Sequence, residues 1–280
     1  MKMKIGAVQT MQVIRQTEAG YILQNDVFLP NEAAETKLTK GEKADVFLYN
    51  DRKGAILATT THPLVQVDEF DWAEVVDVVS GLGVFVDIGI EKEMLVSQDD
   101  LPLFESVWPV EGDMLFVTLT ADKKNRLRAT PATEQIFEEH WNLASTDLLN
   151  QSINGRIYHT NKEGSAMISK NSYRGFIHHT ERKQEPRLGE WVEGRIIDVK
   201  EEGTLNVSLR PLKQEGMHED ADAILNYLEQ NDGLMHFSDK SDPEDIRGTF
   251  SISKAAFKRA LGRLMKEGKV KQSDGKTYLI

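Results

Sequence analysis

One strand pattern recurs three times along the first 216 residues, and this recurrence limits the possible folds more than any other feature. In each copy a glycine and an acidic residue, Gly41-Glu42, Gly112-Asp113 or Gly189-Glu190, precede a run in which apolar residues alternate with others. Alternation with a period of two is typical of a strand with one buried face. The copies are longer than the repeats of solenoid proteins. Each copy is therefore predicted to be a small complete domain.

Each copy is predicted to contain five strands. Two strands joined by a glycine turn are followed by a short third strand, then by the strand after the Gly-acidic pair, and then by a closing strand. Five short strands with period-two patterning are typical of a small closed barrel. A sandwich of two sheets stays possible, but it would need more strands in each copy. The predicted strands span residues 9–15, 21–24, 27–29, 44–48 and 55–60, then 74–79, 84–88, 94–96, 114–119 and 126–130, then 155–160, 166–169, 176–178, 191–196 and 205–209.

The tail has a different periodicity. Apolar residues at helical spacing predict a helix over residues 220–230, and Pro243 begins a second short helix. Ser253 is predicted to cap a third helix over 254–267, which carries Phe257, Leu261 and Leu264 on one face. Two strand-like runs around Asp274-Gly275 indicate a hairpin. Three helices followed by a hairpin are typical of a winged-helix domain.

Four domains follow from these patterns. Residues 1–62, 63–149 and 150–216 are predicted to form three tandem barrels, and residues 217–280 the winged helix, which gives a mainly β fold with some α. The second range ends in a polar, helix-permissive stretch over residues 132–149 that contains Trp141. We expect this stretch to be a connecting helix that packs on a barrel.

Charge is distributed unevenly over these domains. The chain has a formal net charge of −11, but residues 63–149 hold 18 acidic and 5 basic residues, whereas residues 252–280 hold 8 basic and 2 acidic ones. Contact with phosphate depends on Lys and Arg. The second barrel is therefore predicted to bind nucleic acid weakly or not at all, and to act as a spacer or as a contact for a protein partner.

The third copy carries candidate base-stacking residues on its third strand. Phe176 and His178 alternate with Ile177, so they share one face while Ile177 faces the core. Barrels of this kind bind single strands by stacking bases on rings and neutralising phosphates with basic side chains. Further charge and a further ring are expected from Arg174, Arg156, Tyr158 and Lys162. The alternative is that Phe176 is a core residue and His178 an ordinary surface residue.

The third helix of the tail carries a basic face. Its cations recur at spacings of three and four residues, opposite the apolar stripe, and further lysines extend them into the hairpin. They could form a solvated surface that balances the acidic first helix. Their confinement to the helix and wing favours nucleic-acid binding. The candidate residues are Lys254, Lys258, Arg259, Arg263, Lys266 and Lys271.

Motifs of enzymes and metal sites are absent from the sequence. It has no cysteine, no His-Glu-x-x-His motif and no glycine-rich phosphate loop. His178 and His179 are adjacent on a predicted strand, so they point to opposite faces and are poorly placed to share a metal. We expect no catalytic residues, no cofactor and no metal. No apolar run approaches the length of a membrane span, and we expect a cytoplasmic protein.

The third copy resembles an S1 RNA-binding domain, which is a variant of the OB-fold. The resemblance rests on Gly155-x-Ile157, Gly164, Gly175-Phe176-Ile177-His178, on the run from Gly189-Glu190 to Ile196-Ile197-Asp198, and on Val207-Ser208-Leu209. One position departs from the pattern: Ala166 stands where an aromatic residue of the second strand is expected. Phe85 occupies that place in the second copy, and Ile22 occupies it in the first. The resemblance implies three S1-type barrels, of which the third has an incomplete stacking platform.

Three such copies are followed by a tail with a distinct sequence from Phe250-Ser251-Ile252 to Leu264. With these features, essentially the whole chain resembles the conserved virulence factor B family of Gram-positive bacteria. This resemblance implies an RNA-binding protein that influences gene expression after transcription, including virulence genes in some bacteria. The leading hypothesis is a non-enzymatic regulator whose third barrel and winged helix bind single-stranded RNA together. The alternatives are a DNA-binding transcriptional regulator and an acidic adaptor for a ribosomal or RNA-decay complex.

Overall fold

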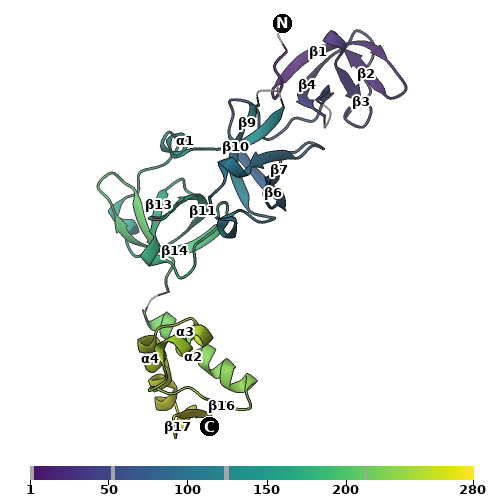
Figure 1. The fold of residues 1–280 in the computed structure, drawn as a ribbon. Coiled ribbons are helices and arrows are strands. Elements are labelled where there is room, and N and C mark those ends of the chain that lie inside the picture. Colours follow the sequence, from purple (N-terminus) through teal and green to yellow (C-terminus); the bar gives the residue numbers. More distant parts are fainter. Residues whose placement is uncertain (1–2, 52–53, 123–125, 212) are drawn as a thin grey trace. The chain divides into compact units, whose positions relative to one another are not determined.

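The computed structural model of this protein describes residues 3–51, 54–122, 126–211 and 213–280. The chain forms two compact units, Met1–Leu209 and Arg210–Ile280. The first unit contains three closed five-stranded barrels that follow one another along the sequence (Figure 1). The predicted mainly β fold with three tandem barrels is thus confirmed, while the domain boundaries at 62, 149 and 216 stay predictions.

All three barrels share one strand topology. The first strand pairs antiparallel with the second and the fourth, and the third strand closes the barrel by pairing in parallel with the fifth. The strands are β1 (Val8–Gln16), β2 (Gly20–Leu23), β3 (Phe28–Pro30), β4 (Lys43–Asn50), β5 (Ile56–Thr59), β6 (Asp71–Val79), β7 (Gly83–Asp87), β8 (Met94–Ser97), β9 (Met114–Ala121), β10 (Leu127–Pro131), β11 (Ser152–Thr160), β12 (Gly164–Ser169), β13 (Arg174–His178), β14 (Trp191–Val199) and β15 (Leu205–Ser208).

A β-bulge interrupts the first strand of every barrel. In β11 the register shifts between Ile157 and His159, so Tyr158 has no cross-strand partner at that point. A bulge bends its strand and increases the local twist, which helps so short a sheet to close. Gly155 lies on the same strand, where an added Cβ atom would approach the backbone oxygen of Ile168 to 2.5 Å. Bulge and glycine together let β11 curve tightly against β12.

The segment between the second and third barrels is not the single helix that the sequence predicted over residues 132–149. Only α1 (Glu134–Glu138) and a 3-10 helix, Thr146–Leu148, are helical. Between them the backbone N–H of Asn142 donates to Ser172 O at 2.7 Å, and that of Ala144 to Gly203 O at 2.9 Å. These bonds to the third barrel replace the hydrogen bonds of a helix. The expected packing on a barrel is confirmed, because Ala144 is buried in the third barrel's core.

The second unit has the predicted winged-helix arrangement. Ser253 caps α4, its Oγ accepting a hydrogen bond from Ala256 N at 3.2 Å, and Asp274 and Gly275 both have the positive φ of a tight hairpin turn. A short strand that the sequence did not predict, β16, adds to the hairpin in the order β16-β18-β17. The elements are α2 (Lys213–Gln230), β16 (Leu234–Met235), α3 (Pro243–Phe250), α4 (Lys254–Lys266), β17 (Val270–Ser273) and β18 (Lys276–Leu279).

The described helices are all too short or too polar to cross a membrane.

Candidate nucleic-acid interface

Strand β13 shows the predicted alternation. Ile177 is fully buried in the barrel core, whereas Phe176 is partly exposed and His178 exposed. The rings of Phe176 and His178 meet edge to face with centroids 6.5 Å apart. Ala166 on β12 lies directly opposite Phe176. The strand therefore presents two rings outward, and a methyl group beside them where a third ring would complete the platform.

Two other candidates from the third barrel are engaged within the protein. Tyr158 is buried, and its hydroxyl donates to Oε2 of Glu134 in α1 at 2.7 Å. Arg174 donates through Nε to Oε1 of the same carboxylate at 3.0 Å. Burial, and next the hydrogen bond to Glu134, raise the pKa of Tyr158 far above its usual value. Neither side chain is free to stack on a base or to neutralise a phosphate, so the structure does not favour these two predicted contacts.

Phe137 of α1 explains the alanine at position 166. Its ring stacks on Tyr158 with centroids 4.0 Å apart and 26° between the planes. Phe137, Tyr158 and Ala166 belong to one buried cluster, which extends to Trp72 and Phe116 of the second barrel. A larger side chain at position 166 would compete with this cluster for space. The protein's own connecting segment thus covers part of the strand face that single-stranded ligands use in OB-type barrels.

The groove beside Phe176 is acidic. It has a volume of about 760 Å³ and lies between the second and third barrels. Asp99, Asp100, Glu134 and Glu163 line it, and Arg174 is the one Lys or Arg among its described lining residues. Arg128 neutralises Asp100 at 3.0 Å from outside the lining. Such a surface repels a phosphate backbone.

Arg156 points outward from β11 toward a second concave surface. Its guanidinium lies 5.6 Å from the ring centroid of Trp72 and 5.2 Å from that of Trp191, and Nη1 donates to Gly189 O at 3.1 Å. The pKa of Arg156 lies below its usual value, because burial lowers it more than the neighbouring Asp113 raises it. Arginine held between two indole rings is stabilised by cation–π attraction in a partly desolvated position.

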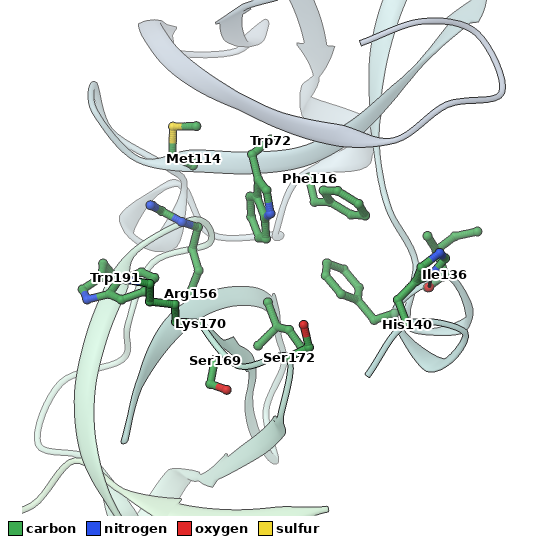
Figure 2. A pocket seen from close by; sticks show the side chains of 12 residues that line it. Trp72, Met114, Phe116, Ile136, His140, Arg156, Ser169, Lys170, Ser172 and Trp191 are labelled. Carbon is green, nitrogen blue, oxygen red and sulfur yellow. Dashed lines mark hydrogen bonds between the residues drawn. The ribbon is translucent and has the colours of Figure 1, made fainter. Parts of the chain in front are cut away.

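The pocket around Arg156 has aromatic walls and basic side chains. Its volume is about 470 Å³, and none of the described residues that line it is acidic. Figure 2 shows Trp72 and Phe116 pointing into it from the second barrel, with Arg156 reaching up from the third. The lining residues are Trp72, Met114, Phe116, Ile136, Phe137, His140, Arg156, Ile168, Ser169, Lys170, Ser172 and Trp191.

The sequence holds a signal for this pocket that motif analysis misses. Trp72 precedes the fully buried Ala73, and Phe116 lies between the buried Leu115 and Val117. Strand geometry therefore places both rings on the outer face of the second barrel. Large apolar residues on the outer face of a barrel indicate that another element, or a ligand, packs there.

The second barrel lacks free arginines on its closing strand. Arg126 pairs with Asp122 at 2.7 Å, and Arg128 pairs with Asp100. Phe85 is partly buried. In the loop after β8, Leu103 and Phe104 are 88% and 63% exposed beside Glu105. The prediction that this barrel binds nucleic acid weakly stays a prediction, as does its role in contacting a protein.

Helix α4 carries the predicted basic face. Phe257, Leu261 and Leu264 are buried in the core of the second unit. Lys258, Arg259 and Lys266 are exposed, and within the described part of the chain they form no ion pair.

The other basic residues of this unit differ in how free they are. Arg263 is bound to Glu267 at 2.6 Å, and Lys254 Nζ lies 3.5 Å from Lys240 O. Lys271 is exposed on β17. Among the described residues, α4 therefore carries three exposed cations without a hydrogen bond or ion pair, and Lys271 is a further exposed cation on the hairpin.

Among the described residues there is no cluster of three or more His, Cys, Asp or Glu side chains that could hold a metal ion.

Four family models match the chain in order. They are an S1 domain over residues 5–61, the first S1-like domain of CvfB over 70–130, the second domain of the virulence regulatory factor CvfB over 137–211, and a CvfB-like winged helix domain over 222–279. These matches agree with the observed series of three barrels and a winged helix. S1-type barrels and winged helices are both nucleic-acid-binding architectures.

Relatives match over almost the whole chain. An uncharacterized protein, YitL of Bacillus subtilis strain 168, is 44% identical over 99% of this chain and 94% of its own length. The conserved virulence factor B of Staphylococcus saprophyticus is 42% identical over 88% of this chain and 82% of its own length.

A solved structure also matches almost the whole chain. It is the crystal structure of a multidomain protein with nucleic acid binding domains from Streptococcus pneumoniae, which has 38% identity, a TM-score of 0.65, and coverage of 99% of this chain and 98% of that one. Together with the family models and the relatives, this similarity is far above what a shared fold alone would produce. The chain therefore belongs to the conserved virulence factor B family.

Proposed function

We propose that this protein is a cytoplasmic, non-enzymatic regulator of gene expression that binds single-stranded RNA. The observation that carries the proposal is the row of exposed, unpaired cations on α4, Lys258, Arg259 and Lys266, in a chain whose other domains are S1-type barrels. Cations that are free of internal partners can release counterions from a phosphate backbone, which drives non-specific and specific binding alike.

The barrels favour RNA over duplex DNA. Barrels of the OB type bind single strands, whereas a winged helix alone commonly enters the major groove of a duplex. The exposed rings of Phe176 and His178 add a stacking edge on the third barrel. A regulatory role after transcription is consistent with this preference and with the virulence names of the relatives. The alternative, a DNA-binding transcriptional regulator, predicts tighter binding to a duplex.

The proposal is tested with a double charge reversal, Lys258→Glu with Arg259→Glu. We expect binding of a single-stranded RNA to weaken by at least about tenfold and the salt dependence of log K to become shallower by about 1.4, because two phosphate contacts are lost. Fluorescence anisotropy at several salt concentrations measures both quantities. The unaltered protein should bind single-stranded RNA more tightly than duplex DNA at each salt concentration.

The matched control reverses two exposed lysines of the first barrel, Lys37 and Lys40, to glutamate. It changes the net charge equally, so a similar loss in the control would mean that overall charge, and not the α4 surface, governs binding. Tighter binding to the DNA duplex would overturn the RNA proposal and favour the DNA alternative.

A further inference from the structure

The pocket around Arg156 differs in charge from the rest of the second barrel, which forms one of its walls. Residues 63–149 contain 18 acidic side chains, yet none of the described lining residues of this pocket is acidic, and Arg156 and Lys170 supply two positive charges. Trp72 and Phe116 form an apolar wall from the second barrel (Figure 2). A ligand with a flat apolar part and a negative charge would match both features.

Arg156 forms no ion pair with Asp113, the carboxylate that raises its pKa. Asp113 is bonded to Arg187 instead, with distances of 3.1 Å to Nε and 3.3 Å to Nη2. Arg156 itself makes one hydrogen bond, to Gly189 O, and is held between Trp72 and Trp191. Among the residues that the structure describes, no carboxylate bonds to the remaining N–H groups of Arg156. A pre-positioned guanidinium in a partly desolvated site suits a phosphate group.

The size of the pocket limits the ligand. A volume of about 470 Å³ is within the range of sites for small molecules, and it is too small for several stacked bases. Trp191 is 44% exposed at the edge of the pocket, where it offers a further ring face. Ser169 and Ser172 add hydroxyl groups on the side opposite Trp72 (Figure 2). One base with its sugar and phosphate fits these dimensions and these polar groups.

We propose that this pocket, built by the second and third barrels and α1, binds a single nucleotide. The base packs against Trp72 and Phe116, and the phosphate is bound by Arg156 and Lys170. The nucleotide is either free or an unstacked residue of a bound RNA strand, since both present the same base and phosphate. The second form rests on the proposed RNA-binding function, whereas the first does not.

The experiment is a fluorescence titration of the full chain, whose tryptophans include Trp72 and Trp191 at the pocket. Adenosine and uridine 5′-monophosphates form one arm, and a short single-stranded RNA forms the other. We expect saturable quenching in at least one arm. Ribose 5-phosphate, which has no base, should bind at least about fivefold more weakly than a mononucleotide that quenches, because base stacking is lost.

Variants locate the site. Lys170→Glu changes an exposed side chain and should weaken the quenching ligand at least about fivefold, as should Arg156→Gln. Lys200→Glu is the matched control, since Lys200 is an exposed lysine of the same barrel outside the pocket lining, and it should have no comparable effect. Circular dichroism is used to check that the Arg156→Gln variant is folded. If that variant is unfolded, Lys170→Glu, which changes an exposed side chain, still tests the proposal.

The two arms of the titration distinguish a free nucleotide from a nucleotide of an RNA strand, and they also separate the pocket proposal from the proposed RNA-binding function. Quenching by mononucleotides without competition from RNA assigns the pocket to free nucleotides, and competition assigns it to a nucleotide of a strand. No quenching in either arm, or equal effects of Lys200→Glu and Lys170→Glu, overturns the pocket proposal. If the pocket proposal fails but RNA binding still depends on Lys258 and Arg259, the proposed RNA-binding function is supported and only the nucleotide pocket is ruled out.

Discussion

The third barrel borders two concave surfaces of opposite electrostatic character. The groove beside Phe176 is lined by four carboxylates and one ion-paired arginine, whereas the pocket beside Arg156 has two basic residues and no described acidic one. The strand pattern predicts the first surface as the stacking site, but the charges favour the second for a nucleotide. Outward rings on a barrel strand therefore do not define a binding site until the charges of the neighbouring domain are known.

The largest expected effect concerns Phe137, which stacks on Tyr158 of the groove and also lines the pocket. Phe137→Ala should lower the free energy of unfolding by about 3–5 kcal/mol, because it removes a buried ring and leaves a cavity. Urea unfolding followed by circular dichroism measures the change. Phe104→Ala, at an exposed ring, is the control and should change stability by less than about 0.5 kcal/mol. Equal effects would contradict the stabilising role of the Phe137 ring in the buried cluster that joins α1 to the third barrel.

An intermediate effect concerns Tyr158, whose pKa is raised mainly by burial. The unfolded chain releases this proton near pH 10, while the folded chain keeps it, so stability must fall as the pH rises above about 10. Tyr158→Phe should abolish the loss of stability that comes from this titration above pH 10. Below pH 10 it should lower the free energy of unfolding by about 1 kcal/mol, since the hydrogen bond to Glu134 is lost. Urea unfolding at pH values from 8 to 11 tests this.

Phe104→Ala, which removes an exposed ring without an ionisable group, is the control for this measurement. It should keep the decline in stability of the wild-type protein above pH 10. A decline that survives unchanged in Tyr158→Phe would show that the contact between α1 and the groove does not depend on the protonated phenol.

The smallest effect concerns the charge of the groove itself. Glu163→Lys replaces one of its exposed carboxylates and should strengthen binding of single-stranded RNA about two- to fivefold, with a salt dependence steeper by about 0.7. Anisotropy titrations measure both. Glu193→Lys, at an exposed position on β14 outside the groove, changes the net charge equally. A similar gain in both variants would mean that acidity of the groove does not disfavour RNA.

Part of the candidate site was predictable from local pattern. The alternation around Ile177 correctly predicted which side chains of β13 face outward, and the helical spacing correctly placed Phe257 in the core, opposite Lys258 and Arg259. The prediction failed over residues 132–149, where bonds from Asn142 and Ala144 to the third barrel replace a helix. Those partners lie about 30 and 60 positions away in the chain, so no local propensity contains them.

Local sequence patterns were sufficient to predict the three barrels, the winged helix and, away from the β-bulges, the direction in which strand residues such as Phe176 and Ile177 point. Those features follow from backbone periodicity, capping and turn chemistry, which act over a few residues. The packing of the barrels sets the pairing of Arg174 with Glu134 and of Asp113 with Arg187, and it leaves Arg156 without a carboxylate partner among the described residues. These pairings join residues 40 and 74 positions apart, and they depend on how closed barrels pack against each other. The net charge of a binding site therefore depends on tertiary packing, even where the fold around it follows from local sequence periodicity.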